Sequence, residues 1–265
     1  MFDRFNRRIH YLRISVTDRC NLRCEYCMPA DGVPLVSREN ILSFEEIHAL
    51  TAKAVEMGID KVRITGGEPL VRHGILDLIH MLASIAGIAE LTMTTNGILL
   101  PEYATPLRQA GIQRINISLD TIDPVRFREI TRIGEVAQVR AGIKAALSAG
   151  FERVKLNCVV NESSAEPDAQ AVAAFAAEQG LEIRYIRRMD LKTGQFWPIH
   201  GSNGGHCESC SRLRVSSDGR IFPCLFSNRF YSIREHGIET ALRLAVANKP
   251  EAGNKSNMGM HALGG

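Results

Sequence analysis

The sequence predicts an α/β fold, a partial (β/α)6 barrel of the TIM type that is followed by a C-terminal extension. Two observations lead to this prediction. Short apolar strands alternate with amphipathic helices as far as about residue 190, which is the pattern of a parallel sheet flanked by helices. Six such units can be counted, whereas a closed barrel needs eight, so we expect an open, incomplete barrel.

Each unit has its own local signals. The helix that follows the first strand begins with a capping box, Ser43 and Glu46, and stops at Gly58. A second apolar stripe at helical spacing ends at Gly150. The predicted strands cover residues 11–17, 61–65, 91–95, 114–119, 153–160 and 182–189.

The pattern changes after Met189, so we divide the chain into residues 1–190, the partial barrel, and residues 191–265, a C-terminal region. A Gly-rich loop comes first in this region. Residues 212–224 read as a hairpin with an Asp218–Gly219 turn. A helix near 237–247 follows, and the chain ends in Gly264–Gly265.

Composition excludes several classes of function. The net charge of +3 is too small to indicate nucleic-acid binding. We find neither the apolar core of a secretory signal nor a run of about 18 apolar residues that could span a membrane, so we expect a cytoplasmic protein. Clustered cysteines in that compartment indicate metal binding or catalysis rather than disulfides.

Three cysteines, Cys20, Cys24 and Cys27, follow the first strand with the spacing C-x3-C-x2-C. Thiolates are the usual ligands of iron–sulfur clusters, and a 4Fe–4S cluster takes four of them. Three protein ligands leave one iron open to a small molecule, as an open position does in catalytic zinc sites. A zinc knuckle or a redox pair is the alternative, although no Cys or His lies between Cys27 and His48 to complete a zinc site.

Polar motifs follow three further strands. They are GGEP (66–69), TTNG (94–97) and SLD (118–120). The carboxyl ends of parallel strands form the active-site face of a barrel, and glycines there allow close approach of the backbone to a ligand. Each motif alone reads as a plain turn, but together they indicate one site.

A second triad, Cys207, Cys210 and Cys224, has the spacing C-x2-C-x13-C. It fits a zinc site completed by His206 or Cys158, or a second iron–sulfur cluster with an open iron. Arg212 and Arg214 alternate around Leu213, so both should point to one face of a strand. Two guanidinium groups beside a metal site form a receptor for phosphate or carboxylate, which favours the cluster and a C-terminal iron–sulfur extension.

The C-x3-C-x2-C loop resembles the signature of radical S-adenosylmethionine (SAM) enzymes. With the second triad and the Gly-Gly end, the sequence is similar to the GTP 3′,8-cyclases, the lyases that open molybdenum cofactor biosynthesis. The resemblance implies two 4Fe–4S clusters and SAM, whose cleavage yields a 5′-deoxyadenosyl radical that abstracts the ribose 3′ hydrogen of GTP. It implies no catalytic side chain, because the radical is generated from SAM.

The resemblance also implies roles for individual residues. It places Tyr26, Gly67, Ser118 and Met189 against SAM. Arg184 joins the GTP site as a further basic side chain, since a triphosphate needs several compensating charges. A reductant such as ferredoxin or flavodoxin would supply electrons. A homodimer is a possible oligomeric state. The remaining residues that the resemblance assigns to GTP are Arg13, Arg63, Thr94, Lys155, Arg212, Leu213 and Arg214.

Two other functions stay open on the sequence. A radical SAM enzyme with an auxiliary cluster that modifies a peptide or another nucleotide is favoured by Arg187 and by a spacer of only 17 residues between Met189 and Cys207. A non-catalytic zinc-binding interaction module is the third.

Overall fold

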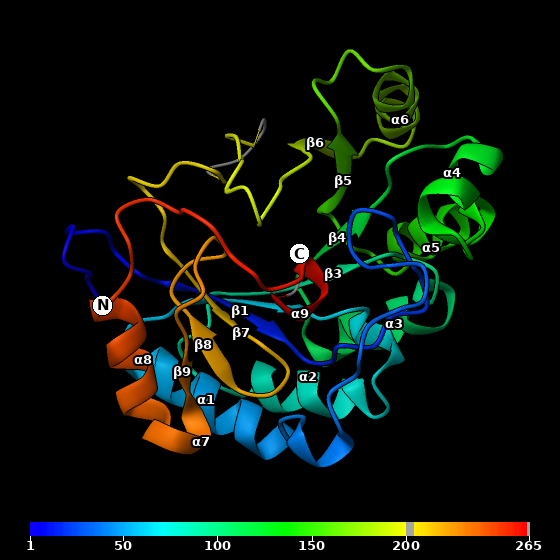
Figure 1. The fold of residues 1–265 in the computed structure, drawn as a ribbon. Helices are drawn as coiled ribbons and strands as arrows, with labels where there is room; N and C mark the ends of the chain where they lie inside the picture. The colour runs from blue at the N-terminus through cyan, green and yellow to red at the C-terminus, as the bar shows by residue number, and fades with distance from the viewer. Residues whose placement is uncertain (200–203, 264–265) are drawn as a thin grey trace.

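The computed structural model describes residues 1–199 and 204–263. Six parallel strands lie side by side in the order β6-β5-β4-β3-β2-β1, and Figure 1 shows the curved sheet to which they belong. Their bounds are β1 (Tyr11–Ser15), β2 (Lys61–Thr65), β3 (Glu90–Thr95), β4 (Arg114–Ser118), β5 (Val154–Val160) and β6 (Glu182–Arg187). The predicted α/β class with a parallel sheet is therefore confirmed. The first and last strands end two residues earlier than predicted.

Helices connect these strands and cover the outer side of the curved sheet (Figure 1). The capping box predicted at Ser43 and Glu46 begins α1, with both reciprocal hydrogen bonds present. Two short 3-10 helices, η1 (Arg38–Asn40) and η2 (Pro69–Val71), lie in loops. The helices are α1 (Phe44–Glu56), α2 (Ile75–Ala83), α3 (Leu100–Ala110), α4 (Pro124–Thr131), α5 (Val136–Ser148) and α6 (Pro167–Glu178).

The C-terminal segment extends the same sheet beyond β1. Strand β7 (Arg212–Val215) pairs parallel with β1, and β8 (Arg220–Phe222) and β9 (Tyr231–Ser232) follow antiparallel. The predicted hairpin is present, with Gly219 at a φ of 86° in its turn, a value that favours glycine. The predicted helix near 237–247 is α8 (Ile238–Ala247), preceded by α7 (Ile233–His236); α9 (Met260–Leu263) lies near the chain end.

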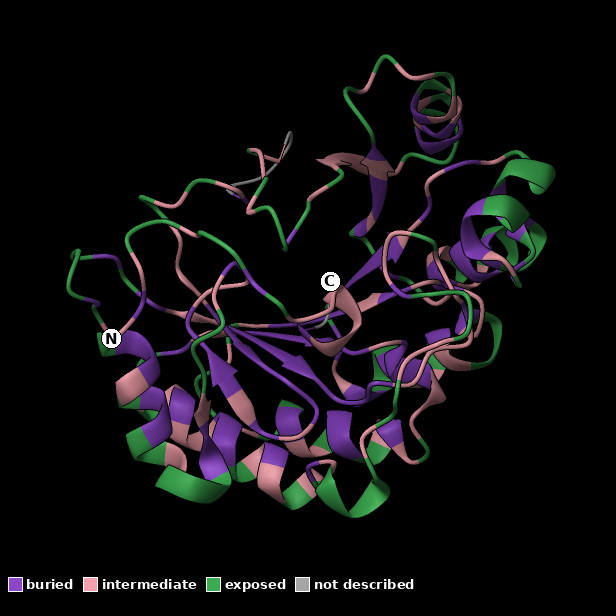
Figure 2. Cartoon of the chain, viewed as in Figure 1, coloured by how far each residue is buried: buried purple, intermediate pink, exposed green. Residues whose placement is uncertain are grey.

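Alternation along the strands separates the core from the open face of the sheet. In β1, Leu12 and Ile14 are fully buried against the helices, and burying each such side chain contributes about 1.5–3 kcal/mol. Arg13 between them points to the other face. Figure 2 shows the buried residues gathered between the sheet and the helices. The inner face is thereby left for polar side chains.

Helix α5 packs directly on the loop that follows β3. A Cβ atom added to Gly142 in this helix would lie 2.0 Å from the carbonyl oxygen of Gly97. Gly97 itself has a φ of 84° and ends the TTNG motif. The missing side chain at position 142 thus lets the helix approach this loop and fix its position.

We expect Gly142→Ala to lower the free energy of unfolding by about 1–3 kcal/mol, the usual cost of overpacking. At an unconstrained helix position the same change would raise stability by about 1 kcal/mol, because alanine favours helix. Urea unfolding measures the sign. The matched control is Ala141→Gly on the exposed side of α5, which should cost only the helix propensity; a stabilised Gly142→Ala variant would contradict the close packing.

Candidate functional site

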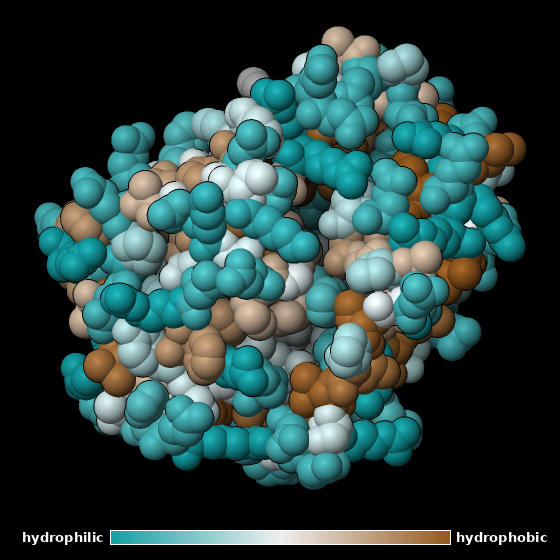
Figure 3. All heavy atoms as spheres, viewed as in Figure 1, coloured by the Kyte–Doolittle hydropathy of each residue, from teal (hydrophilic) through white to brown (hydrophobic). Residues whose placement is uncertain are grey.

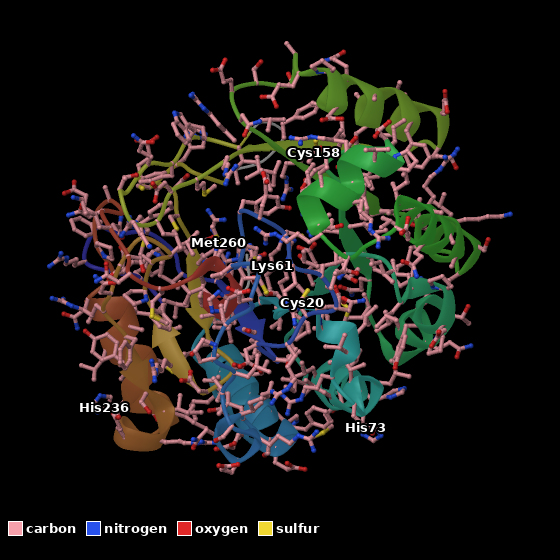
Figure 4. The ribbon with its side chains drawn as sticks, turned by 45° about the vertical axis from the view of Figure 1, so that its right-hand side comes forward. Cys20, Lys61, His73, Cys158, His236 and Met260 are labelled. Atoms are coloured by element: carbon pink, nitrogen blue, oxygen red, sulfur yellow. The ribbon has the colours of Figure 1, made fainter. Side chains whose placement is uncertain are left out.

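One cavity of about 980 Å³ lies on the concave side of the sheet. The space-filling view shows a hollow near the centre of this face, rimmed by hydrophilic side chains (Figure 3). In Figure 4, Cys20, Lys61 and Met260 come from separate elements and lie near the centre of the molecule. The sequence-predicted cysteines of both triads line this cavity: Cys20, Cys24, Cys27, Cys207, Cys210 and Cys224.

The main chain of the GGEP motif holds the start of the first cysteine loop. The Gly67 N–H donates to the Thr17 carbonyl at 2.7 Å, and the Glu68 N–H donates to the Arg19 carbonyl at 2.8 Å. A Cβ atom on Gly67 would lie 2.2 Å from that Arg19 oxygen. Only a residue without a side chain fits against the main chain just before Cys20.

The far side of the same loop is held by Arg132, which follows α4 at a φ of 67°. Its Nη1 donates to the carbonyl oxygens of Arg23 and Met28, at 2.6 and 3.0 Å. These carbonyls flank Cys24 and Cys27 in the chain. Arg132 thus has a positive φ, which is uncommon for a non-glycine residue, and its side chain fixes the cysteine loop.

Glu68 joins the ends of β2 and β3 beneath the cavity. Its carboxylate accepts hydrogen bonds from the Leu70 N–H, the Thr95 hydroxyl and the Asn96 N–H, the last at 2.7 Å. The Asn96 amide in turn donates to Asn21 in the cysteine loop. Burial, with only 1% of the residue exposed, raises the pKa of Glu68 to about 7 despite these hydrogen bonds.

Tyr26 is oriented by Asp120, a residue of the SLD motif to which the sequence assigned no role of its own. The Tyr26 hydroxyl donates to Asp120 at 2.6 Å, and the Val159 N–H donates to the other carboxylate oxygen at 2.8 Å. Burial raises the pKa of Asp120 to about 6. The motif position at a strand end was the signal that could have pointed to Asp120.

Three arginines form a continuous band across neighbouring strands. Arg13 of β1 is in register with Arg63 of β2 on one side and with Arg214 of β7 on the other. All three are buried, with 5–8% of each residue exposed. Burial, and then the charge of Arg214, lower the pKa of Arg13 well below its ordinary value. So many buried cations in one row favour an anionic ligand.

Several polar atoms of the cavity wall are buried without a hydrogen-bond partner among the described residues. Leaving such an atom unsatisfied costs about 1–3 kcal/mol, so a polar ligand that pairs with them would bind favourably. Thr94 and Arg184, both predicted substrate contacts, are in this set. The atoms are Tyr11 Oη, Thr65 Oγ1, Thr94 Oγ1, Arg114 Nε, Asn157 Oδ1 and Arg184 Nε.

Most of the residues assigned by resemblance line this cavity, and two do not. Lys155 instead forms an ion pair with Glu182 at 2.5 Å, and the Leu213 side chain is fully buried in the core. Gly264 and Gly265 lie outside the described residues, but the Leu263 carbonyl accepts a hydrogen bond from Arg214 at 3.3 Å. Those lining the cavity are Tyr26, Gly67, Ser118, Met189, Arg13, Arg63, Thr94, Arg184, Arg212 and Arg214.

The cysteines of the described residues take part in no disulfide and in no single-ion metal site. Within residues 1–199 and 204–263, no three His, Cys, Asp or Glu side chains converge on one metal-ion position, as a zinc site requires. A cluster instead distributes its thiolates over separate irons. All seven cysteines are free thiols, and Cys158 lies in the hydrophobic core, away from the cavity.

Comparisons with known proteins show the family of the chain. A family model described as the radical SAM superfamily matches residues 14–171. The chain belongs to the radical SAM superfamily. As a radical SAM protein it uses SAM and an iron–sulfur cluster, and the matched range includes the loop with Cys20, Cys24 and Cys27. No helix in the described part of the chain is long and apolar enough to cross a membrane.

The radical SAM protein has close relatives in sequence. It is 36% identical to a GTP 3′,8-cyclase of Alkaliphilus oremlandii over 320 positions that cover 100% of both chains. It is 40% identical to a GTP 3′,8-cyclase of Geobacter sulfurreducens, covering 95% of this chain and 93% of that one. The alignment with the Alkaliphilus relative has 320 positions, more than the 265 residues of this chain. Part of that relative's sequence therefore has no counterpart in this chain.

Solved structures share the fold of this radical SAM protein. The enzyme anSMEcpe with bound AdoMet matches with a TM-score of 0.65 at 16% identity, covering 90% of this chain and 78% of that one. SuiB of Streptococcus suis bound to S-adenosylmethionine matches with a TM-score of 0.61 at 15% identity, covering 91% and 64%.

Stability should depend on pH through Glu68. Its pKa lies at about 7 in the folded protein and near the ordinary 4.5 when unfolded, so the folded state binds more protons between these values. The free energy of unfolding should therefore fall as the pH rises from about 4.5 to about 7, with Glu68 contributing up to about 3 kcal/mol.

In urea titrations of the protein without cofactors, Glu68→Gln should reduce the fall of the unfolding free energy with rising pH. The fall that remains should come from Asp120. Glu56→Gln at the exposed end of α1 is the control and should leave the slope intact. An unchanged slope in Glu68→Gln would refute the assignment of the proton to Glu68.

Proposed function

We propose that this chain is a radical SAM GTP 3′,8-cyclase, a lyase of molybdenum cofactor biosynthesis that converts GTP into (8S)-3′,8-cyclo-7,8-dihydroguanosine 5′-triphosphate. The observation that carries the proposal is that both cysteine triads and a buried arginine band line one cavity. The printed names of the relatives supply the reaction. We assign residues 1–190 to the radical SAM unit and residues 191–265 to the binding of the second cluster.

At the first site, Cys20, Cys24 and Cys27 hold the cluster that binds SAM. When bound, SAM and this cluster supply the radical that removes a hydrogen atom from the substrate. Tyr26, fixed by its hydrogen bond to Asp120, contacts the adenine, and Gly67, Ser118 and Met189 complete the SAM site. No side chain need act as an acid or base, so the chain positions and shields the reactants.

At the second site, Cys207, Cys210 and Cys224 would hold another 4Fe–4S cluster, which would supply an open coordination position for the substrate. Burial opposes ionisation of Cys210, but the charges of Lys249 and then Arg212 lower its pKa to about 7. A thiol that ionises near neutral pH is a ready iron ligand. At Cys224, by contrast, burial outweighs the charge of Lys249 and raises the pKa of the thiol, so this electrostatic preparation applies to Cys210.

The triphosphate lies against the arginine band. Charge-assisted hydrogen bonds to guanidinium groups are the strong ones, and the buried setting of Arg13, Arg63 and Arg214 strengthens them further. Arg184, Arg212 and Thr94 add donors from other strands. Lys155 joins this set by exchanging Glu182 for phosphate, and Leu213 contributes its main chain, since its side chain is in the core.

The reaction also needs an external reductant for the first cluster. A one-electron donor such as ferredoxin or flavodoxin would fill this role, and the compartment that we propose for the reaction is the cytoplasm. A homodimer is compatible with the proposal but is not needed for it, because one chain supplies both cysteine triads.

Anaerobic incubation of the iron–sulfur-reconstituted protein with GTP, SAM and a chemical reductant tests the proposal. We expect 5′-deoxyadenosine and the cyclised nucleotide in equal amounts by liquid chromatography with mass spectrometry. The Cys24→Ala variant should form neither, because its first cluster lacks a ligand. Formation of 5′-deoxyadenosine without a product derived from GTP would refute the cyclase and direct the search to a peptide or another nucleotide.

Arg212→Ala should weaken GTP binding by about 10- to 100-fold, since a hydrogen bond to a charged group is worth about 1.5–3 kcal/mol. Slow SAM cleavage uncoupled from GTP should persist. Calorimetric titration with GTP measures the affinity. The matched control is Arg243→Ala, an exposed arginine of α8 that pairs with Glu239; equal affinities of the two variants would place the triphosphate elsewhere.

A further inference from the structure

A buried lysine joins the segments that carry the second cysteine triad. Lys249, just after α8, is 1% exposed. Its Nζ donates to the Arg212 carbonyl at 2.7 Å and to the Pro223 carbonyl at 2.6 Å. Arg212 lies two residues after Cys210, and Pro223 directly precedes Cys224. One ammonium group thus fixes the distance between the two parts of the triad.

A buried arginine near the N-terminus, Arg7, holds Cys207, the remaining cysteine of the second triad. Arg7 donates through Nη1 to the Cys207 carbonyl at 2.7 Å and to the Glu251 carbonyl at 2.8 Å, and through Nη2 to the Pro250 carbonyl at 2.6 Å. Its Nε forms an ion pair with buried Asp3 at 2.7 Å. Cys207 is thereby tied to the segment that directly follows Lys249.

The two cations differ in how their charge is balanced. Arg7 has the carboxylate of Asp3. Burial lowers the pKa of Lys249, whereas the nearby thiols of Cys210 and then Cys224 raise it. A buried ammonium group is costly without a compensating negative charge. Thiolate ligands of an anionic cluster are the partners that this position offers.

We propose that Lys249 and Arg7 are the positioning residues of the second cysteine triad, and that Lys249 also supplies the positive charge that stabilises the reduced cluster held there. The inference rests on the proposed function, because it needs the second cluster. Groups of this kind around a metal site act through the ligands, and their loss typically costs about 10- to 100-fold in metal affinity.

The test isolates the second cluster in the full-length chain. In a Cys20→Ala, Cys24→Ala, Cys27→Ala background, anaerobic reconstitution should give about four irons per chain, the content of one 4Fe–4S cluster. Iron content, the visible absorbance of the cluster and its reduction potential are then compared after adding Lys249→Met, Lys249→Gln, or the control Lys144→Met on the exposed side of α5.

Lys249→Met should lower the iron bound per folded chain. Lys249→Gln keeps an N–H donor but loses the charge, so it should retain more iron and shift the reduction potential to more negative values. Lys144→Met should match the background in both. If both Lys249 variants keep the iron content and the reduction potential of the background protein, the inference is overturned, even if their melting temperatures fall. If Lys249→Met does not fold, the potential of Lys249→Gln decides alone.

The Arg7 contact is tested with Asp3→Asn, Arg7→Gln together, which removes the buried ion pair without leaving an unpaired charge. This double variant should lose iron from the second site while the potential of the cluster that remains stays unchanged. Full iron content would overturn the role of Arg7. A background protein that binds no iron at all would instead overturn the second cluster, and with it the proposed function.

Discussion

The parallel pairing of β7 with β1 is the constraint on which the site depends. The first triad follows β1 and the second triad surrounds β7 and β8, so the pairing brings both to one cavity. It also sets Arg214 beside Arg13, and Arg13 beside Arg63. A slip of one residue in the register of β7 would turn Arg212 and Arg214 into the core and Leu213 toward the cavity. The register of β7 therefore decides which of its side chains reach the cavity.

Charge is handled differently at the two ends of this cavity. Around the first triad, carboxylates dominate: Glu68 and Asp120 are buried, and both have raised pKa values. Around the second triad and the strands between, the buried charged groups are mainly cationic, with Asp3 beside Arg7 as a buried carboxylate. Burial, and then neighbouring cations, lower the pKa values of Arg13, Arg214 and Lys249. Such a cavity presents its positive end to an anion with little reorganisation, because the arginines are already desolvated and held by strands. Under the proposed function, the carboxylate end would receive the cationic sulfonium of SAM and the cationic end would receive the triphosphate.

Local patterns in the sequence were sufficient for much of this arrangement. The capping box of α1, the hairpin at Gly219 and the shared face of Arg212 and Arg214 depend on neighbouring residues, and all three are present. The pairing of β7 with β1 could not be predicted in the same way, because strand partners so far apart in the chain leave no periodic signal. The ion pair of Lys155 with Glu182 depends on the register of β5 and β6. Lys249, in a polar stretch near the chain end, looks like a surface residue until α8 folds against β8 and buries it.

The central claim is that both cysteine triads hold iron within one cavity. A crystal structure of the reconstituted protein, with anomalous diffraction measured at the iron absorption edge, tests it most directly. The account predicts two iron peaks, one bounded by Cys20, Cys24 and Cys27 and the other by Cys207, Cys210 and Cys224. A single peak at the first triad, with the second triad empty or occupied by zinc, would contradict it.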